Sequence, residues 1–391
     1  MRNLWVISEF FSVSNATGYI MTSIVEKLAQ QTEVNVISVG KSSVKEQPNT
    51  HIHTIKDIQL NKNKFFQRIL KQLIISVKIF WKALRQIKRH DRIVCVTNPA
   101  LVLLFLYLVK VIKRSKLIII VHDIFPDNLL PIAVMKKNAI LFRITHHLFS
   151  SIYRRADKVI AIGRDMQKHL QDETKQKDRI VFVPNFADIT QIVPQKKETN
   201  RILNELGLTD KFVILFAGNT GKMQNISFVL EIIKCLQEDT NIHFLFIGQG
   251  ACEQQMKNFI TENKLTNITF LPYMDKSMEP EFMNAGDVGL ISLSRNMKGT
   301  GVPSKPYQYM AAGKPLLALM GNDTETALMI EEQQIGWLID DIDPIVAANK
   351  IRKIQEDKMA IAEKSLTARK VCEQHYSKEL ITGQYAIEIL M

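Results

Sequence analysis

The chain has 391 residues, a length at which one hydrophobic core usually gives way to two domains of roughly 150 to 200 residues. Hydrophobic residues make up 46% and charged residues 23% of it, a composition that excludes a disordered or fibrous protein. The net charge of +12 is unevenly divided: residues 1–190 carry 30 Lys and Arg against 14 Asp and Glu, hence +16, and residues 191–391 carry −4. The basic character therefore belongs to the first half alone.

Cysteine spacing and apolar segments exclude further classes. The four cysteines are far apart and form no CxxC pair, which argues against a disulfide framework and a zinc site. The first residues, MRNLWVISEFF, lack the basic and long apolar regions of a signal peptide and are typical of a first strand. The longest apolar run, residues 100–109, is shorter than the roughly 18 to 20 residues that span a bilayer. We therefore expect a cytoplasmic protein.

Short β-branched runs alternate with longer helical patterns along the first half. Such runs are typical of strands buried on both faces, which predicts a parallel sheet covered by helices. The predicted strands here are LWVIS, VNVISV, RIVCVT, KLIIIVH, KVIAI and RIVFVP.

The second half repeats this design. Its predicted strands are KFVILFAG, IHFLFIGQG, ITFLP, DVGLISL, KPLLAL and IGWLI. The polar segment between the halves, VPNFADITQIVPQKKETN, is the natural linker. We therefore predict an α/β protein of two doubly wound, Rossmann-like domains, residues 1–188 and 200–372, with a terminal helical segment, residues 373–391, that packs back on the first domain.

The turn after the first strand weighs against a nicotinamide or flavin enzyme. A dinucleotide-binding domain would carry GxGxxG there, and SEFFSVSNATGYIM contains only Gly18. Gly18 could let the loop approach a phosphate at the start of the next helix. A plain turn glycine explains it equally well.

The loop after the strand in IIIVHDIFPDNLLP is a candidate site. His122 and Asp123 lie just past the carboxyl end of that strand, where ligands bind in open α/β sheets. A histidine there can hydrogen-bond a sugar hydroxyl or polarise a reacting group, although a lone histidine is also commonly structural. Asp123 and Asp127 are more typical of loop and capping residues.

Three loops at strand ends of the second half suit a nucleotide. In VILFAGNTGKMQN two glycines expose backbone N–H groups and Lys222 adds a positive charge, which together form a plausible diphosphate cradle. The turns in LFIGQG and ITFLPYM could pair with and stack on a nucleobase, or be tight turns before helices.

The stretch TGVPSKPYQYMAAG, residues 300–313, predicts a short helix. Ser304 suits its N-cap, and Pro306 is tolerated in the first turn because its missing N–H would be unsatisfied anyway. Lys305 adds a full charge to the positive end of this helix. We therefore expect phosphate to bind there.

Taken together, GVPSKPYQYMAAGKPLLA, FAGNTGKMQN, IGQG, VHDIFPD and VPNFAD resemble the retaining glycosyltransferases of family four. These enzymes have the GT-B fold, in which two Rossmann-like domains face each other across a cleft. The nearest likeness is to bacterial enzymes that build lipid-linked surface polysaccharides. The resemblance covers nearly the whole chain, and the segment from PSK to AAG is its most specific part.

The resemblance implies a nucleoside-diphosphate sugar, which we expect to be UDP-linked, held mainly by the second domain, and an acceptor on the first. His122, Lys222 and Lys305 are the implied catalytic residues. No metal or other cofactor is expected, because lysines and a helix dipole can neutralise the leaving diphosphate. The expected donor-binding residues are Gly18, Gly218, Asn219, Gly248, Gln249, Leu271, Pro272, Tyr273, Thr300, Gly301, Val302, Ser304 and Gln308.

The chain departs from the family pattern at three points. Many members carry two glutamates around the PSK segment, and here Thr300 and Gln308 stand in their place. Lys222 replaces a common arginine, and its usual lysine companion is replaced by the region of Gln224 and Asn225. With no carboxylate nucleophile in the pattern, we expect the departing diphosphate to help deprotonate the acceptor hydroxyl on the same face.

Residues 62–92 predict a basic amphipathic helix, with aromatic residues among ten cations and Asp91 as the one acid. Such a helix suits an anionic membrane surface, and an ordinary solvated helix with a core stripe is the alternative. No nucleic-acid-binding module is present, so no nucleic acid is expected. The cations are Lys62, Lys64, Arg68, Lys71, Lys78, Lys82, Arg85, Lys88, Arg89 and Arg92.

We therefore predict a hexosyl- or N-acetylhexosaminyltransferase at the inner face of the plasma membrane. Its acceptor is a glycan on polyprenyl diphosphate, and its product is an O-antigen, capsule or exopolysaccharide. A nucleotide-sugar 2-epimerase of the same fold is the alternative, as is a non-catalytic partner subunit that binds a nucleotide sugar.

Overall fold

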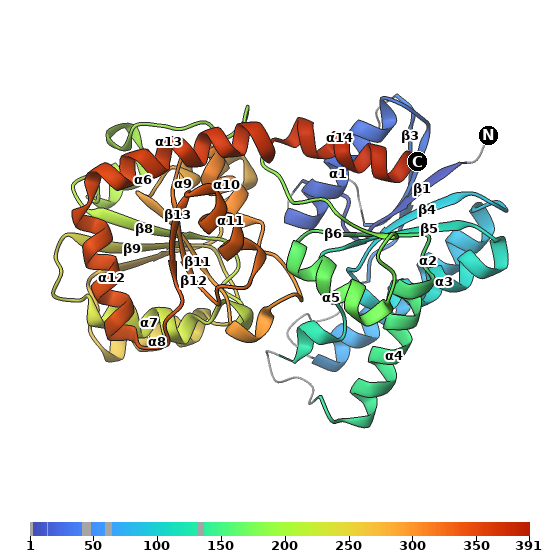
Figure 1. The fold of residues 1–391 in the computed structure, drawn as a ribbon, viewed down its shortest axis with the longest axis horizontal. Coiled ribbons are helices and arrows are strands. Elements are labelled where there is room, and N and C mark those ends of the chain that lie inside the picture. The colour runs from blue at the N-terminus through green and yellow to red at the C-terminus, as the bar shows by residue number, and fades with distance from the viewer. Residues whose placement is uncertain (1–2, 14, 41–47, 59–64, 131–136) are drawn as a thin grey trace. The chain divides into compact units, whose positions relative to one another are not determined.

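The computed structural model describes residues 3–13, 15–40, 48–58, 65–130 and 137–391. The chain divides into two compact units (Figure 1). Unit 1 consists of Met1–Pro184, Gly299–Val302 and Leu380–Met391, and unit 2 of Asn185–Lys298 and Pro303–Glu379. Each unit is built around one sheet of parallel strands with helices on its faces, as the alternating sequence pattern predicts.

The sheet of unit 1 has seven strands in the order β3-β2-β1-β4-β5-β6-β7. Val6 lies opposite Val36 on one side and Val94 on the other, and all three side chains are fully buried. Parallel strands covered on both faces need such β-branched residues at nearly every position. The strands are β1 (Leu4–Ile7), β2 (Val34–Val39), β3 (Thr50–Ile55), β4 (Arg92–Val96), β5 (Lys116–Val121), β6 (Lys158–Ala161) and β7 (Ile180–Phe182).

Strand β3 is absent from the predicted set. Its sequence, THIHTI, has only two apolar residues, Ile52 and Ile55, and the strand lies at the edge of the sheet and pairs with β2 alone. An edge strand is only partly covered, so it lacks the continuous apolar run that marks the inner strands.

The helices of unit 1 pack on both faces of this sheet. On one face, α2, α3, α4 and α5 bury their apolar stripes in a single core with the strands. The helices are α1 (Ala16–Ala29), α2 (Phe65–Gln86), α3 (Ala100–Lys113), α4 (Ile140–Arg155), α5 (Arg164–Thr174) and α14 (Lys378–Leu390). None of the helices among the described residues is both long and apolar enough to cross a membrane.

Unit 2 repeats the design with six parallel strands in the order β10-β9-β8-β11-β12-β13. All six coincide with predicted runs. They are β8 (Phe212–Ala217), β9 (Ile242–Ile247), β10 (Ile268–Leu271), β11 (Val288–Ser292), β12 (Leu316–Leu319) and β13 (Gly336–Ile339). The helices are α6 (Arg201–Leu206), α7 (Ile226–Cys235), α8 (Glu253–Glu262), α9 (Glu279–Met283), α10 (Lys305–Ala311), α11 (Glu325–Gln333), α12 (Pro344–Glu356) and α13 (Lys358–His375).

The segment predicted as a linker belongs to unit 2 from Asn185 onward. Arg369 of α13 donates hydrogen bonds to the carbonyl groups of Ile189 and Ile192, and Ala187 pairs with the turn after α13. These contacts give an irregular segment the backbone partners that it cannot supply itself.

The last residues, Leu380–Met391, group with unit 1. Arg92 at the start of β4 donates to the carbonyl groups of Ile389 and Leu390. Lys158 at the start of β6 forms an ion pair of 2.8 Å with Glu388. Helix α14 is therefore held along the amino ends of these strands.

Candidate functional site

In unit 2, two glycines allow the loops that follow β8 and β9 to pack closely against each other. Gly218 and Gly248 have φ values of +125° and +150°, where a side chain would be strained. A Cβ atom on Gly248 would lie 2.0 Å from the carbonyl oxygen of Gly218. The Gly218 N–H donates to Ile247, and the Gly248 N–H donates to Leu271. Only glycine permits this approach, so the ends of the three neighbouring strands are held in one fixed arrangement.

Lys305, the first residue of α10, lies beneath this pair of loops. A Cβ atom on Gly218 would lie 2.8 Å from Cε of Lys305. The Nζ atom is buried, lies 3.4 Å from the centroid of the Phe216 ring, and has no hydrogen-bond partner among the described residues. An ammonium group offers three donors, so Lys305 could bind an anion through Nζ at this position.

Burial lowers the pKa of Lys305 to about 7. The physical cause is desolvation, which disfavours the charged ammonium in an apolar environment. An anion beside Nζ would favour the protonated form and raise this pKa again.

Helix α10 is fixed by a tyrosine one turn after Lys305. The Tyr309 hydroxyl accepts a 2.8 Å hydrogen bond from the Ala217 N–H and donates one of 3.1 Å to the Leu215 carbonyl. Its ring lies against Gly289, where a Cβ atom would come within 2.3 Å of it. These contacts join α10 to β8 and β11 and so determine where Lys305 lies.

Ser304 occupies the N-cap position of α10, but its side chain makes no capping hydrogen bond. It has helical backbone angles, whereas a capping serine normally has extended ones. The sequence-based expectation of a capping side chain is therefore wrong at this point. On the same helix, Gln308 is buried with 9% of its surface exposed.

The other residues predicted in unit 2 lie in the same set of strand-end loops. Lys222 begins a 3-10 turn, Lys222–Gln224, and is exposed. Burial raises the pKa of the Cys252 thiol, which lies just before α8, and the positive charge of Lys222 opposes this rise. The exposed set also includes Asn219, Gln249, Pro272 and Tyr273, and Leu271 is half-buried.

In unit 1, the predicted loop after β5 pairs with the short segment Gly299–Val302. Asp123 forms an antiparallel bridge with Gly301, and the Ile124 N–H donates a 2.9 Å hydrogen bond to the Thr300 carbonyl. The backbone N–H groups of His122 and Asp123 both donate to the hydroxyl of Thr97, at 3.1 Å. The His122 loop therefore has a defined backbone conformation.

The imidazole of His122 is available for a ligand. Its Nε2 atom is buried and has no hydrogen-bond partner among the described residues. Burial lowers the pKa of His122 to about 4 and raises that of Asp123 to about 6. At neutral pH the imidazole is therefore uncharged and can exchange a hydrogen bond with a hydroxyl group.

The stretch of residues 300–313 is divided between the units. Thr300, Gly301 and Val302 belong to unit 1 with His122, whereas Ser304 onward belongs to unit 2 with Lys222 and Lys305. The structure thus groups the predicted residues into two sets, one at the strand ends of each sheet.

Gly18 packs closely against the loop that precedes it. A Cβ atom there would lie 2.1 Å from the Ser12 carbonyl oxygen. Its N–H donates a 2.8 Å hydrogen bond to Asn15, the N-cap of α1. The close approach of the preceding loop accounts for a glycine at this position.

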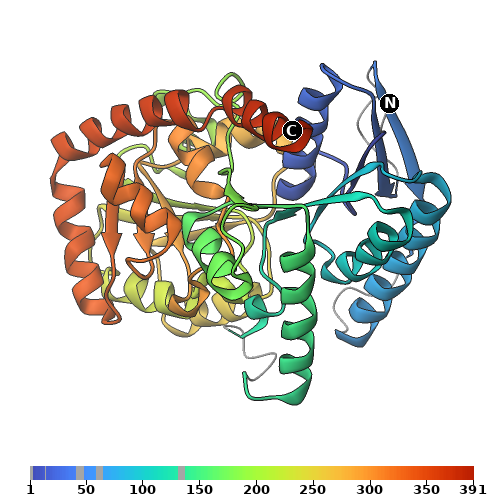
Figure 2. The ribbon, with the colours of Figure 1, turned by 45° about the vertical axis from the view of Figure 1, so that its right-hand side comes forward.

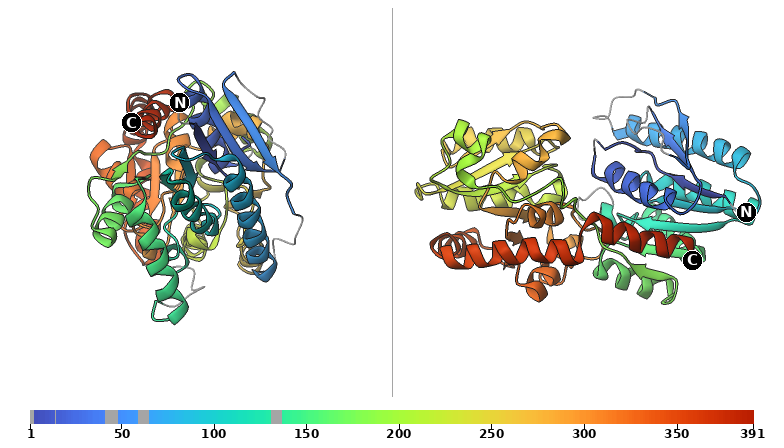
Figure 3. Two further views of the ribbon diagram at one scale, coloured as in Figure 1. Left: turned by 90° about the vertical axis from the view of Figure 1, so that its right-hand side faces the viewer. Right: turned by 90° about the horizontal axis from the view of Figure 1, so that it is seen from above.

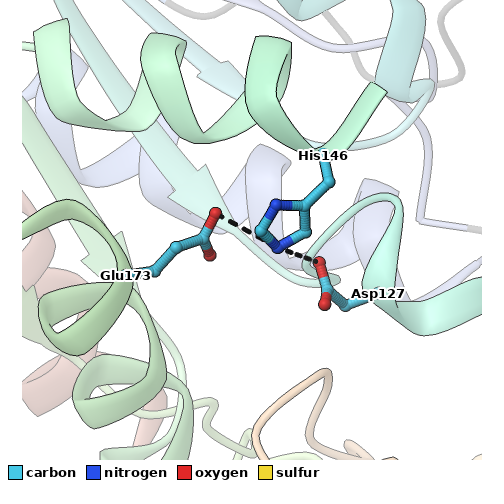
Figure 4. Close-up of side chains that lie close together, drawn as sticks. All are labelled: Asp127, His146 and Glu173. Atoms are coloured by element: carbon cyan, nitrogen blue, oxygen red, sulfur yellow. Dashed lines mark ion pairs between the residues drawn. The ribbon is translucent and has the colours of Figure 1, made fainter. Parts of the chain in front are cut away.

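The sequence did not single out a cluster formed by Asp127, His146 and Glu173 (Figure 4). Nε2 of His146 lies 3.6 Å from Asp127 and 3.4 Å from Glu173. His146 belongs to α4 and Glu173 to α5, while Asp127 lies in a 3-10 turn, Asp127–Leu129. These donor types could hold a divalent cation. No local sequence signal could have linked them.

The predicted basic helix, residues 62–92, corresponds to α2 but was drawn too long: α2 ends at Gln86, Lys88 and Arg89 lie in the loop that follows, and Arg92 begins β4. Ile75, Ile79 and Ala83 are buried in the core of unit 1, so its apolar stripe packs against the sheet. Trp81 is 53% exposed and lies with Lys78, Lys82 and Arg85, among others, around a groove of about 630 Å³. Lys62, Lys64 and the side chain of Arg68 lie outside the described residues.

Two family models match the chain. "Glycosyl transferases group 1" matches residues 198–371, and "Glycosyltransferase Family 4" matches residues 18–191. The first match lies in the second half of the chain, and the second match lies in the first half.

Named relatives and solved structures agree with these models. A probable glycosyltransferase of Pseudomonas aeruginosa, WbjE, is 31% identical, with 99% of this chain and 97% of that protein covered. A putative colanic acid biosynthesis glycosyl transferase of Escherichia coli, WcaI, is 24% identical over 60% of this chain and 57% of its own length. Anabaena HepE, solved with UDP and glucose, shares 17% identity over 99% of both chains with a TM-score of 0.74. The chain therefore belongs to the glycosyltransferases of family four and has their GT-B fold of two Rossmann-like domains.

Proposed function

We propose that this glycosyltransferase moves a sugar from a UDP-sugar to a lipid-linked glycan, with retention of configuration, during the synthesis of a surface polysaccharide. The observation that carries the proposal is the buried Nζ atom of Lys305, which lies beside the loops of Gly218 and Gly248 and has no hydrogen-bond partner among the described residues. The names of two similar proteins support the substrates: HepE was solved with UDP-glucose, and WcaI is named for colanic acid biosynthesis.

In this proposal Lys305 binds the diphosphate and stabilises the negative charge that builds on it as the sugar leaves. A donor placed where charge develops acts mainly on the transition state. Lys222 provides a second positive charge from the exposed side of the loop. The two lysines take the place of a metal ion, so transfer requires none.

The departing diphosphate serves as the base. Thr300 and Gln308 offer no carboxylate that could attack the sugar. The acceptor oxygen forms its bond to the anomeric carbon on the face that the diphosphate leaves, and its proton passes to a diphosphate oxygen. Gln308 hydrogen-bonds the ribose through its amide, and the loop of Leu271, Pro272 and Tyr273 meets the base.

His122 contributes as a neutral imidazole. A pKa of about 4 keeps it uncharged at physiological pH, so it offers the donor sugar a hydrogen bond. Its Nε2 atom, which has no partner among the described residues, is the atom that makes this contact.

The acceptor is a glycan on polyprenyl diphosphate at the inner face of the plasma membrane, and the enzyme acts there from the cytoplasm. The basic first half of the chain supports this part of the proposal. The cations around the α2 groove, Lys78, Lys82 and Arg85, attract anionic lipid headgroups.

A thermal-shift panel of UDP-, GDP-, ADP- and dTDP-sugars identifies the donor, because a ligand that binds the folded state raises the melting temperature by mass action. We expect the largest shift with a UDP-hexose or UDP-N-acetylhexosamine. Multiple-turnover release of UDP with a lipid-linked acceptor then measures transfer. Epimerisation of the sugar without an acceptor would contradict the proposal, as would the absence of any turnover.

A further inference from the structure

Helix α4 exposes a row of large apolar side chains. Ile140, Leu141, Ile144 and Leu148 are 76%, 65%, 59% and 44% exposed. Their spacing of one, three and four residues places them on one face of the helix. Scattered surface hydrophobes need no explanation, but a contiguous row of four marks an interaction surface.

The opposite face of α4 supplies its packing. Phe142, Phe149 and Tyr153 are buried, and Phe149 and Tyr153 belong to the core of unit 1. The contacts of His146 with Asp127 and Glu173 further hold this side to its neighbours. The outer apolar row is therefore not needed to attach the helix to its own domain.

The charged side chains that α4 and its flanking residues carry are all basic. Residues 137–156 contain no Asp or Glu. Lys137 precedes the row, Arg143 flanks it, and Arg154 and Arg155 close the helix, and all four are exposed. Figures 2 and 3 show the first turns of α4 reaching beyond the other helices of unit 1.

We propose that α4 is a membrane-inserting helix that places Ile140, Leu141, Ile144 and Leu148 among the acyl chains of an anionic bilayer. Cations on the flank of an exposed apolar row are the pattern of a helix that lies in the lipid interface. The inference rests on the lipid-linked acceptor of the proposed function and names the surface that brings the enzyme to it.

Helix α2 presents both kinds of group. It buries one apolar stripe in the core and exposes Leu70, Leu73 and Trp81 together with its cations, whereas the exposed apolar side chains of α4 form a row of four. A second copy of the chain is a poorer occupant of the α4 face, because a symmetric dimer would place its arginines close to those of the partner.

Flotation of the full-length protein with vesicles of phosphatidylglycerol and phosphatidylcholine tests the proposal. We expect wild type to float, and I144E/L148E to bind at least about tenfold more weakly, because two carboxylates oppose both insertion and headgroup charge. The variant I144A/L148A adds no charge, and we expect it to lose affinity to a smaller extent. The control I345E/L366E changes two residues of unit 2 that are 60% and 76% exposed and should float as wild type does.

Melting temperatures within about 2 °C of wild type would show that both α4 variants remain folded. Equal flotation of wild type and I144E/L148E overturns the proposal, as does a wild type that stays unbound. A dimer in light scattering that I144E/L148E converts to a monomer, with no change in flotation, assigns the face to a second copy instead.

UDP release with a water-soluble acceptor separates this proposal from the proposed function. I144E/L148E should retain wild-type turnover in that assay. A wild type that transfers sugar but does not float refutes the membrane role of α4 alone. A wild type that floats but never releases UDP refutes the proposed function alone.

Discussion

The two units share one design, a parallel sheet with helices on its faces, but use it differently. In unit 2 the strand ends are interlocked through Gly218 and Gly248 around a buried lysine. In unit 1 the strand-end histidine is neutral, and a helix presents apolar and cationic side chains to solvent. The difference teaches that one architecture can hold a buried lysine at the strand ends of one unit and expose an apolar, cationic helix on the other.

Removal of the lysine side chain in unit 2 should have the largest effect on turnover. We expect Lys305→Ala to lower turnover by about 100- to 1000-fold, because a charge-stabilising group in a buried site acts mainly on the transition state. UDP release under saturating donor measures this. Lys298→Ala, which changes an exposed lysine paired with Asp323, is the matched control and should leave turnover nearly unchanged.

Thermal unfolding of Lys305→Met tests whether removal of the same charge leaves stability unchanged or increases it. The folded-state pKa of about 7 lies below the ordinary value of 10.5, so burial of Lys305 costs stability fully below pH 7 and by less as pH rises toward 10.5. We expect the melting temperature of Lys305→Met to equal or exceed that of wild type. A large decrease would mean that Lys305 holds the fold together instead of awaiting a ligand.

A methyl group at Gly248 tests the interlocked loops. Its Cβ would lie 2.0 Å from a backbone oxygen, at a φ of +150°, so Gly248→Ala should cost about 2 to 4 kcal/mol of unfolding free energy. Donor affinity should decrease at least about tenfold. Gly383→Ala lies in a helix with nothing within 4 Å and should be neutral or stabilising by up to about 1 kcal/mol. Denaturant unfolding of both variants distinguishes a specific clash from a general intolerance of substitution.

The strand-end residue of unit 1 should have a smaller effect. We expect His122→Ala to reduce turnover by about tenfold to 100-fold, the value of one or two hydrogen bonds. Because its pKa is about 4, His122 should add no inflection to the rate profile near pH 6.5. An inflection near pH 6 would belong to Asp123 and should disappear in Asp123→Asn.

Donor binding should depend on pH through Lys305. If a diphosphate needs the protonated ammonium and the free-enzyme pKa is about 7, affinity decreases as pH rises, by about tenfold between pH 6 and pH 8. UDP-glucose is a suitable probe because its diphosphate does not titrate in this range. Lys305→Arg keeps its charge at both pH values, so calorimetric titration of this variant should give a much flatter profile.

The smallest effect is expected from chelation. The proposed chemistry uses lysines in unit 2, so EDTA should leave transfer unchanged within about twofold. A loss of activity restored by a divalent cation would contradict metal-independent transfer and direct attention to Asp127, His146 and Glu173.

The sequence predicted those features that depend on residues close together in the chain. All six strands of unit 2 and the His122 loop followed from apolar runs and their ends. Edge strand β3 was not predicted, because a partly exposed strand lacks a continuous apolar run. The contact of Lys305 with Phe216 joins residues far apart in sequence, and so does the pairing of His146 with Glu173. Such contacts depend on how the loops and helices pack, which the sequence pattern does not encode.

The most direct measurement compares the affinities of UDP and uridine for wild type and Lys305→Met at pH 6.5. A diphosphate site at Lys305 predicts that wild type binds UDP far more tightly than uridine, and that the variant loses most of this difference while its affinity for uridine stays the same. An unchanged difference between UDP and uridine in the variant would contradict the assignment of Lys305 as the diphosphate ligand.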